Sequence, residues 1–358
     1  MTRTAVVLFN LGGPDSVRAV RPYLRNLFSD PAIIGLPAPL RQMLAAFIAW
    51  RRSGFAIENY KKIGGASPLL PETEAQATAL EQALRDLGDL ADFRVFIAMR
   101  HWHPRARAAL AAIKAYGPDR ILLLPLYPQY STTTTGSSLA EWRREAKRAG
   151  IAAETRAICC YPRQPGFVAA LAGEIRTAMN GAAAAPAASG RKPRVLFSAH
   201  GLPLHIAKRG DPYPWQVEET VKAVLEVLNQ PDLDWVICYQ SRVGPLPWLS
   251  PATEAEIARA GRDKTPIVLV PVAFVSEHSE TLVELDIDYR ARAAAAGVPS
   301  YTRLPTVGTN GKFIQGLASI VRDTLAGTGQ DRVLAAAGGG RICPAACRQC
   351  AIEQQGAA

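Results

Sequence analysis

The sequence predicts an α/β protein that has two similar doubly wound domains, each built on a parallel sheet. Three observations predict this class. Short apolar runs of strand length recur along the chain, segments of helical composition separate them, and a stretch rich in Ala, Gly and Pro at 180–193 divides them into two groups. Strands that alternate with helices form parallel sheets, because each helix returns the chain to the same edge.

Three apolar runs lie on each side of the Ala-rich stretch, which is typical of two Rossmann-like halves. In chain order they are Ala5 to Phe9, Arg94 to Met99, Ile121 to Pro125, Val195 to Ser198, Trp235 to Tyr239 and Ile267 to Val272. A helix is expected over Gln164 to Met179. We therefore predict an N-terminal domain at 1–163, a C-terminal domain at 164–325, and an extension at 326–358 that is an appendage and not a third domain.

Composition excludes several classes of protein. The 358 residues are 48% apolar, enough for a large core and two domains. The formal charge is +10, but Lys and Arg are scattered, so no nucleic acid partner is expected, whereas an anionic substrate or an acidic membrane surface would suit. The sequence shows no export signal and no apolar stretch of the ~20 residues that span a bilayer, so a cytoplasmic protein is expected.

The peptides that follow the strands contain the polar, aromatic and glycine residues that could form a binding site. Ligands of open parallel sheets bind beyond the carboxyl ends of the strands, so these peptides are expected to gather in one cleft between the halves. They are Asn10 to Pro14, Arg100 to Pro104, Leu126 to Ser131, Ala199 to Pro203, Gln240 to Pro245 and the acidic segment at 276–288. None contains a glycine-rich nucleotide-binding motif, so no nucleotide is expected.

The acidic segment at 276–288 has five carboxylates and one histidine, with no Lys or Arg. Glu280, Glu284 and Asp288 are four residues apart, so a helix places them in one row. An α-helix turns this row by about 40° per step, whereas a wider helical turn straightens it. A solvated acidic face is the alternative, but the position after a strand favours a site for a divalent metal.

His200 ends the fourth apolar run, in Ser-Ala-His-Gly-Leu-Pro, where Gly and Pro favour a sharp exit. His200 and Glu280 then leave strands of the same sheet and are expected to face one ligand. For His101 and His103, which flank a Trp, a packed turn is favoured over metal binding.

Seven peptides resemble the ferrochelatase family in their sequence and in their order, over residues 4 to 325. They are LFNLGGPDS (8–16), YKKIGGASP (60–68), YPQYSTTTTGSS (127–138), SAHGLP (198–203), RGDPYP (209–214), YQSRVGPLPWL (239–249) and SEHSETLVELDIDY (276–289). The resemblance implies insertion of Fe²⁺ into protoporphyrin IX, which gives protohaem and releases two protons.

The same resemblance implies roles for the acids and the histidine. His200 would bind iron or accept a pyrrole proton, with Glu280 as its partner, and the division of these two tasks stays open. Glu284 and Asp288 would conduct protons or hydrated metal. Imidazole and carboxylate ligands suit Fe²⁺, and they would also suit zinc or cobalt.

A porphyrin needs apolar walls and donors for its propionates. The expected walls, on three of the gathered loops, are Leu11, Tyr127 and Trp248, and the residues that align with porphyrin-binding positions of the family are Arg52, Tyr60 and Ser67. The apolar segment at 33–52 corresponds to the family's lip, where an amphipathic helix would cover the porphyrin and touch the inner membrane as a peripheral contact. Oligomeric state is left open.

Three of the six cysteines form a C-x₃-C-x₂-C cluster in the tail, at Cys343, Cys347 and Cys350. Such clustering in a cytosolic chain favours metal thiolates over disulfides. The fourth ligand is expected to be Cys159 or Cys160. Some ferrochelatases carry a [2Fe-2S] cluster on a C-terminal extension, which this arrangement resembles, although its spacing differs from the animal pattern. Zinc bound by four thiolates is the alternative.

Two other functions stay open at the sequence level. A non-catalytic porphyrin or haem carrier would need an axial ligand but no row of acids, so His200 together with Glu280 favours the enzyme. A chelatase specific for coproporphyrin would need the same residues.

Overall fold

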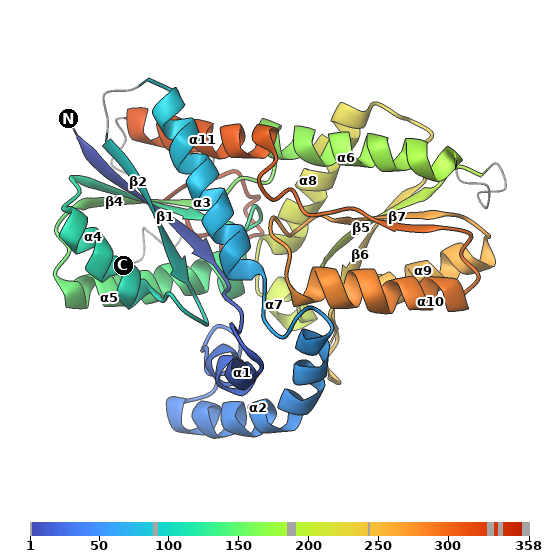
Figure 1. Ribbon diagram of the computed structural model, residues 1–358, viewed down its shortest axis with the longest axis horizontal. Coiled ribbons are helices and arrows are strands. Elements are labelled where there is room, and N and C mark those ends of the chain that lie inside the picture. The colour runs from blue at the N-terminus through green and yellow to red at the C-terminus, as the bar shows by residue number, and fades with distance from the viewer. Residues whose placement is uncertain are drawn as a thin grey trace. The chain divides into compact units, whose positions relative to one another are not determined.

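The structure, a computed structural model, describes residues 2–88, 92–184, 191–242, 244–327, 333–335 and 339–352. It contains two parallel sheets with helices packed on them, which confirms the predicted fold class (Figure 1). The chain divides into two compact units. Unit 1 comprises Met1–Tyr161, Leu317–Ile342 and Ala351–Ala358, and unit 2 comprises Pro162–Gly316 and Cys343–Cys350.

The sheet of unit 1 has the order β2-β1-β3-β4-β9, and every neighbouring pair is parallel. Its strands are β1 (Arg3–Asn10), β2 (Asp92–Met99), β3 (Arg120–Pro125), β4 (Glu154–Cys160) and β9 (Val333–Ala335). The first three contain the predicted apolar runs. Because β9 lies in the C-terminal extension, part of that extension belongs to the first sheet and is not a separate appendage.

Helices cover both faces of this sheet. The helices α4 (Ala106–Tyr116) and α5 (Ser137–Ala149) pack on the face that carries Ala5, Val7 and Phe9 of β1. The helix α3 (Leu69–Asp86) contacts β1 and β2 from the opposite face (Figure 1). Unit 1 also contains two short helical segments, the 3₁₀-helix η1 (Val17–Ala19) and the π-helix η2 (Thr132–Gly136).

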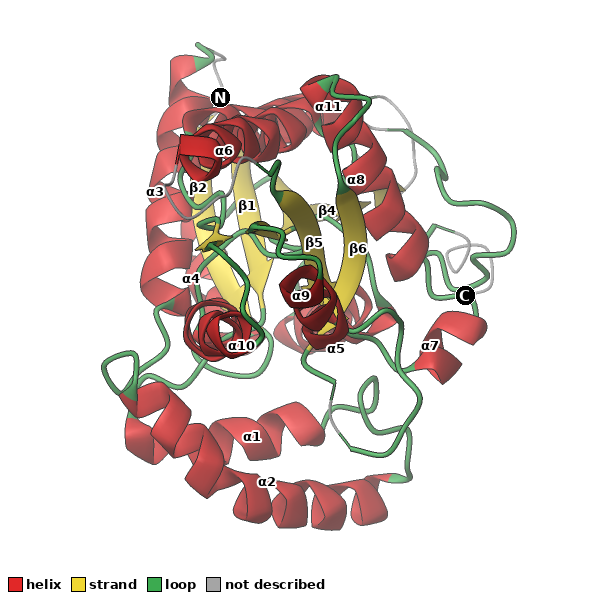
Figure 2. Ribbon diagram, turned by 90° about the vertical axis from the view of Figure 1, so that its right-hand side faces the viewer, coloured by secondary structure: helices red, strands yellow, loops and turns green. Residues whose placement is uncertain are grey.

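A helical hairpin extends from the body of unit 1. Its helices are α1 (Val20–Phe28) and α2 (Ala38–Lys61), which pack against each other through Val20, Tyr23, Leu24, Ala49 and Tyr60 (Figure 2). This hairpin contains the segment at 33–52 that the sequence predicts as a lip. No helix in the described part of the chain is both long enough and apolar enough to cross a bilayer.

The sheet of unit 2 has the order β6-β5-β7-β8 and is also parallel throughout. Its strands are β5 (Arg194–His200), β6 (Trp235–Gln240), β7 (Ile267–Pro271) and β8 (Tyr301–Arg303). One face carries α9 (Thr253–Arg262), the π-helix η4 (Glu280–Asp288) and α10 (Tyr289–Ala295). Helices α6 (Pro165–Ala184) and α8 (Tyr213–Leu228) pack side by side on the other.

The division into units does not follow the predicted boundaries everywhere. Helix α11 (Gly311–Ala326) spans the division, and residues 343–350 of the tail group with unit 2, to which α7 (Leu204–Lys208) also belongs. Residues 185–190 of the predicted linker lie outside the described residues. The domain boundaries at 163 and 325 stay predictions.

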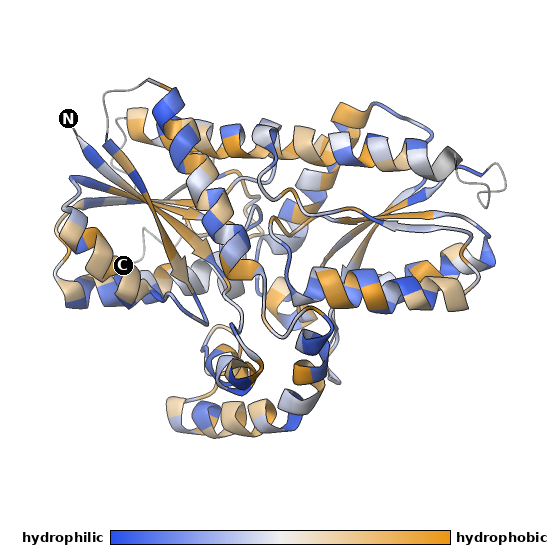
Figure 3. Ribbon diagram, viewed as in Figure 1, coloured by the Kyte–Doolittle hydropathy of each residue, from blue (hydrophilic) through white to orange (hydrophobic). Residues whose placement is uncertain are grey.

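The central strands are buried on both faces, which explains why the sequence shows them as continuous apolar runs. Residues Ala5 to Leu8 of β1 and Ile267 to Val270 of β7 have no exposed surface. Figure 3 shows the same contrast, with hydrophobic strands between helices that alternate hydrophilic and hydrophobic residues. The polar residues that follow these strands are therefore attached to the buried core of each sheet.

Candidate active site

His200 and Glu280 face each other at the carboxyl end of the second sheet. His200 is the last residue of β5, and its neighbour β7 leads through a loop into η4, which Glu280 begins. The His200 Nδ1 atom lies 2.8 Å from the Glu280 Oε2 atom. The sequence-based expectation that both residues leave strands of one sheet and approach each other therefore agrees with the geometry.

Each member of this pair stabilises the charge of the other. Burial lowers the pKa of His200, but the charge of Glu280 and its hydrogen bond outweigh burial, so the pKa lies above its ordinary value. Burial raises the pKa of Glu280, but His200 and then His278 hold that pKa well below its ordinary value. The contact therefore favours the imidazolium form of His200 and the carboxylate form of Glu280.

The segment after Glu280 is a π-helix, the wider turn that straightens a row of residues four apart. The backbone N–H of Ser241 donates to Glu284 Oε1 at 2.8 Å. The Ser241 hydroxyl donates a short hydrogen bond to Glu284 Oε2 and lies 3.4 Å from Glu280 Oε2. One hydroxyl thus lies between two successive carboxylates of the row.

Proton affinity differs along this row. Burial and then the charge of Glu280 raise the pKa of Glu284, although hydrogen bonds from Ser241 oppose the shift. The Tyr289 hydroxyl also donates to Glu284 Oε1, at 3.0 Å. Asp288, the last residue of η4, is half-buried. A proton released near His200 therefore finds its first high-affinity carboxylate at Glu284 and not at Glu280.

The other two carboxylates of the acidic segment do not join the row. Arg303 of β8 forms an ion pair with Glu277 at 2.7 Å and a longer one with Asp286 at 3.5 Å. Arg290 also pairs with Asp286, at 2.5 Å. The apparent self-repulsion of the segment is thus partly neutralised by an arginine distant in sequence, which leaves Glu280, Glu284 and Asp288 as the row.

Sequence reasoning missed several residues that touch this site. Ser241 directly follows β6 in a peptide that was singled out, but its contact depends on a left-handed backbone with φ of 58°. Tyr213 donates to the His200 carbonyl oxygen at 3.0 Å. The ring of His278 packs 4.5 Å from that of Phe274, and its Nε2 atom lies 3.8 Å from Glu280 Oε2.

The predicted porphyrin-binding residues lie in both units. Trp248 is in unit 2, where it bridges to Pro203 and lies beside Gly201, so that a Cβ atom at Gly201 would be 3.2 Å from its ring. Leu11 and Tyr127 follow β1 and β3 in unit 1. Also in unit 1, Tyr60 and Ser67 are buried, and the Arg52 guanidinium lies 5.8 Å from the centre of the Phe28 ring.

The two histidines that were expected to be structural lie in a packed turn. His101 has no exposed surface, and burial followed by the charges of Arg100 and Arg105 holds its pKa well below the ordinary value. The ring of His103 lies 5.1 Å from that of Trp102, in an edge-on contact. Both positions are consistent with the expected turn.

The tail cysteines Cys343, Cys347 and Cys350 are buried in unit 2. The amide nitrogen of Gln216 lies 3.2 Å from Cys343 Sγ, as a donor to sulfur. Cys159 and Cys160 end β4 in unit 1, with their sulfur atoms 3.2 Å apart. In the described part of the chain no three His, Cys, Asp or Glu side chains are grouped so that they could hold a metal ion.

Comparison with known proteins identifies close relatives. The ferrochelatase family model matches residues 3–325. A protein of Phenylobacterium zucineum named ferrochelatase is 51% identical, covering 99% of this chain and 100% of the relative. Ferrochelatases of Caulobacter vibrioides (50%) and Pelagibacter ubique (47%) cover 90% and 89% of this chain, and 90% of each relative.

A solved structure also has a similar fold. The sirohydrochlorin chelatase SirB from Bacillus subtilis subspecies spizizenii, in complex with cobalt, aligns with a TM-score of 0.51 at 12% identity. The alignment covers 90% of this chain and 95% of that chain. At this identity the likeness supports the fold alone.

Proposed function

This chain belongs to the ferrochelatase family, and we propose that it inserts Fe²⁺ into protoporphyrin IX, which gives protohaem and releases two protons. The observation that carries the proposal is the His200–Glu280 contact at the start of the π-helix that contains Glu280, Glu284 and Asp288. Metal insertion needs a group that accepts pyrrole protons, together with ligands that replace the waters of Fe²⁺. An imidazole and a carboxylate in contact provide both.

The pKa shifts of His200, Glu280 and Glu284 suggest an order for the proton transfers. His200 can accept a pyrrole proton only as the neutral imidazole, and Glu280 raises the pKa of that imidazole. Glu280 has a low pKa and Glu284 a raised one, so the proton passes beyond Glu280 and comes to rest on Glu284. The Ser241 hydroxyl, which contacts both carboxylates, provides the connecting hydrogen bonds. Asp288 continues the row toward solvent.

The remaining porphyrin contacts are proposed on chemical grounds. Leu11, Tyr127 and Trp248 provide apolar walls, and Arg52, Tyr60 and Ser67 provide a guanidinium and two hydroxyls for the propionates. Coproporphyrin, which has more carboxylates, is the alternative substrate that the same donors would accept.

The protein acts in the cytoplasm with peripheral membrane contact. Helix α2 carries large apolar side chains that are more than half exposed, at Leu40, Met43, Phe47, Trp50 and Phe55. Exposed apolar side chains along one helix are typical of an interfacial helix, and they would bring the enzyme to a substrate that partitions into lipid.

The tail cysteines are proposed to hold a [2Fe-2S] cluster, with Cys159 or Cys160 as the fourth ligand. Burial of the three tail sulfurs and the donor contact from Gln216 suit thiolate ligands. A charge-transfer spectrum in the visible range, lost in Cys347→Ser, supports the cluster, whereas a colourless protein with bound zinc supports the alternative.

The test of the main proposal is anaerobic incubation with Fe²⁺ and porphyrin, followed by loss of porphyrin fluorescence. Turnover of protoporphyrin IX is expected, and parallel reactions with coproporphyrin separate the two substrates. Binding of both porphyrins without turnover would instead identify a tetrapyrrole carrier.

A further inference from the structure

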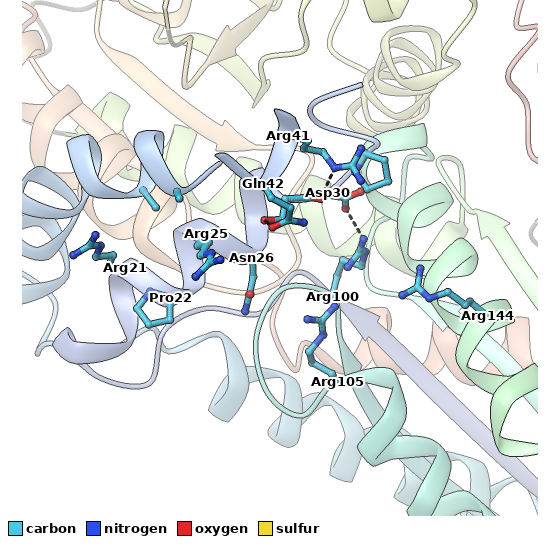
Figure 4. A pocket seen from close by; sticks show the side chains of 14 residues that line it. Arg21, Pro22, Arg25, Asn26, Asp30, Arg41, Gln42, Arg100, Arg105 and Arg144 are labelled. Atoms are coloured by element: carbon cyan, nitrogen blue, oxygen red, sulfur yellow. Dashed lines mark hydrogen bonds and ion pairs between the residues drawn. The ribbon is translucent and has the colours of Figure 1, made fainter. Parts of the chain in front are cut away.

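Unit 1 contains a pocket that the proposed chemistry does not use. It has a volume of about 780 Å³ and lies between the α1–α2 hairpin and the body of the unit (Figure 4). Its most frequent lining residue is arginine, contributed by three helices and by the turn after β2: Arg21, Arg25, Arg41, Arg100, Arg105 and Arg144.

The floor of the pocket is a fixed network of ion pairs. Arg100 pairs with Asp30 at 2.8 Å and with Glu141 at 3.4 Å, and these three side chains are almost completely buried. Arg105 and Arg144 also pair with Glu141. Arg144 pairs with Glu145 as well, at 3.1 Å, so the floor has three carboxylates for its three guanidiniums and carries no excess charge of its own.

The walls of the pocket add three further cations without acidic partners. Arg41 donates to the carbonyl oxygens of Ser29 at 2.9 Å and of Leu36 at 2.5 Å, which fix its position but leave its charge. Arg21 and Arg25 lie one turn apart on α1, and neither side chain has an ion pair or hydrogen bond within the described residues. Like charges at this spacing repel, and a bound anion would relieve the repulsion.

The arrangement of these groups selects the kind of anion. Guanidiniums approach the cavity from α1, from α2 and from the floor, as Figure 4 shows. A tetrahedral oxyanion can accept hydrogen bonds from several directions, whereas a planar carboxylate accepts them mainly in its plane. The excess of three positive charges, on Arg21, Arg25 and Arg41, calls for more than one negative charge. The residues Pro22, Pro31, Ala46 and Ala49 leave apolar surface for an organic part.

We propose that this arginine pocket binds a multiply charged phosphate group. The proposal does not depend on the metal chemistry. The phosphate has two plausible sources, a soluble diphosphate and the headgroup of an anionic phospholipid. Helix α2 contributes Arg41 and Gln42 to the pocket and also carries the exposed Met43 and Phe47, so a membrane is within the reach of the same helix.

The test is a titration of the full-length protein with inorganic pyrophosphate by isothermal calorimetry, and a sedimentation assay with vesicles of phosphatidylglycerol or phosphatidylcholine. The variant Arg21→Gln with Arg25→Gln is expected to weaken binding roughly tenfold or more. The matched control is Arg107→Gln with Arg143→Gln, two exposed arginines outside the pocket that also lack partners among the described residues. This control should change binding by less than about twofold.

The two probes distinguish the sources. Vesicle binding that needs phosphatidylglycerol and falls in the Arg21/Arg25 variant assigns the site to lipid. Pyrophosphate binding that falls in this variant, with unchanged vesicle binding, assigns it to a soluble phosphate. Absence of saturable binding of either probe to the unsubstituted protein, or an equal loss in the control variant, overturns the proposal.

Discussion

At the scale of single residues, the chemistry of the candidate site depends on the contact between Glu280 and His200. The Glu280→Gln substitution removes the negative charge but keeps the shape of the side chain. We expect the rate of metal insertion to fall by about 100-fold or more, while porphyrin affinity changes little. Asp286→Asn is the matched control on the same helix, because Asp286 faces Arg290 and Arg303 and not His200. Similar losses in the two variants would remove Glu280 from the proposed role.

The same contact makes a prediction about pH. Because Glu280 raises the pKa of His200 above 6.5, the neutral imidazole forms only as the pH rises through this raised value. The insertion rate should therefore increase with pH across that range. In Glu280→Gln burial still lowers the His200 pKa and only the charge of Glu284 opposes it, so this pKa should be lower than in the unsubstituted protein, as measured by NMR titration. A pKa that does not move would show that the two groups are uncoupled in solution.

At the scale of elements, the longer apolar strands could be predicted from sequence, and the short or half-polar strands could not. The runs in β1, β3, β5 and β7 are buried on both faces and are therefore continuously apolar. Strand β4 begins with the polar residues Glu154 to Arg156, and β8 and β9 have three residues each. Such short or half-polar segments carry too little periodicity to separate them from loops.

The candidate site also contains residues that could be predicted from sequence and residues that could not. His200 and Glu280 could be predicted because strand ends in a parallel sheet meet at one edge. The roles of Ser241 and Arg303 could not, since the first depends on a left-handed backbone and the second on pairing with a helix 17 to 26 residues earlier in the chain. The sequence did not predict that η4 is a π-helix. It indicated only that a turn wider than an α-helix would bring the row of acids into line.

Arg303 is expected to be important for the stability of the η4 region. It is almost buried and pairs with both Glu277 and Asp286, so Arg303→Gln leaves two carboxylates without that partner. We expect a loss of about 3 kcal/mol in the free energy of unfolding, measured with urea. The control Arg322→Gln removes an exposed pair with Asp323 and should cost about 1 kcal/mol or less. Equal losses would mean that the Arg303 pairs are solvated.

At the scale of the whole molecule, the distribution of apolar surface determines where the enzyme can work. The central strands β1 and β7 are buried, and many of the large exposed apolar side chains lie on α2. The proposed peripheral membrane contact requires such a helix with exposed apolar side chains. The formal charge of +10 would strengthen contact with an acidic surface.

This distribution predicts that membrane contact can be removed without loss of folding. Met43 and Phe47 are 71% and 58% exposed, so Met43→Ser with Phe47→Ser deletes little core packing. Burial of one such side chain in lipid contributes about 1.5–3 kcal/mol, and the double variant should therefore bind vesicles roughly tenfold or more weakly. Leu87→Ser with Val227→Ser, two exposed apolar residues away from α2, is the control in the same sedimentation assay. If the control weakens binding as much as the α2 variant, the contact is a general effect of hydrophobicity and not a property of this helix.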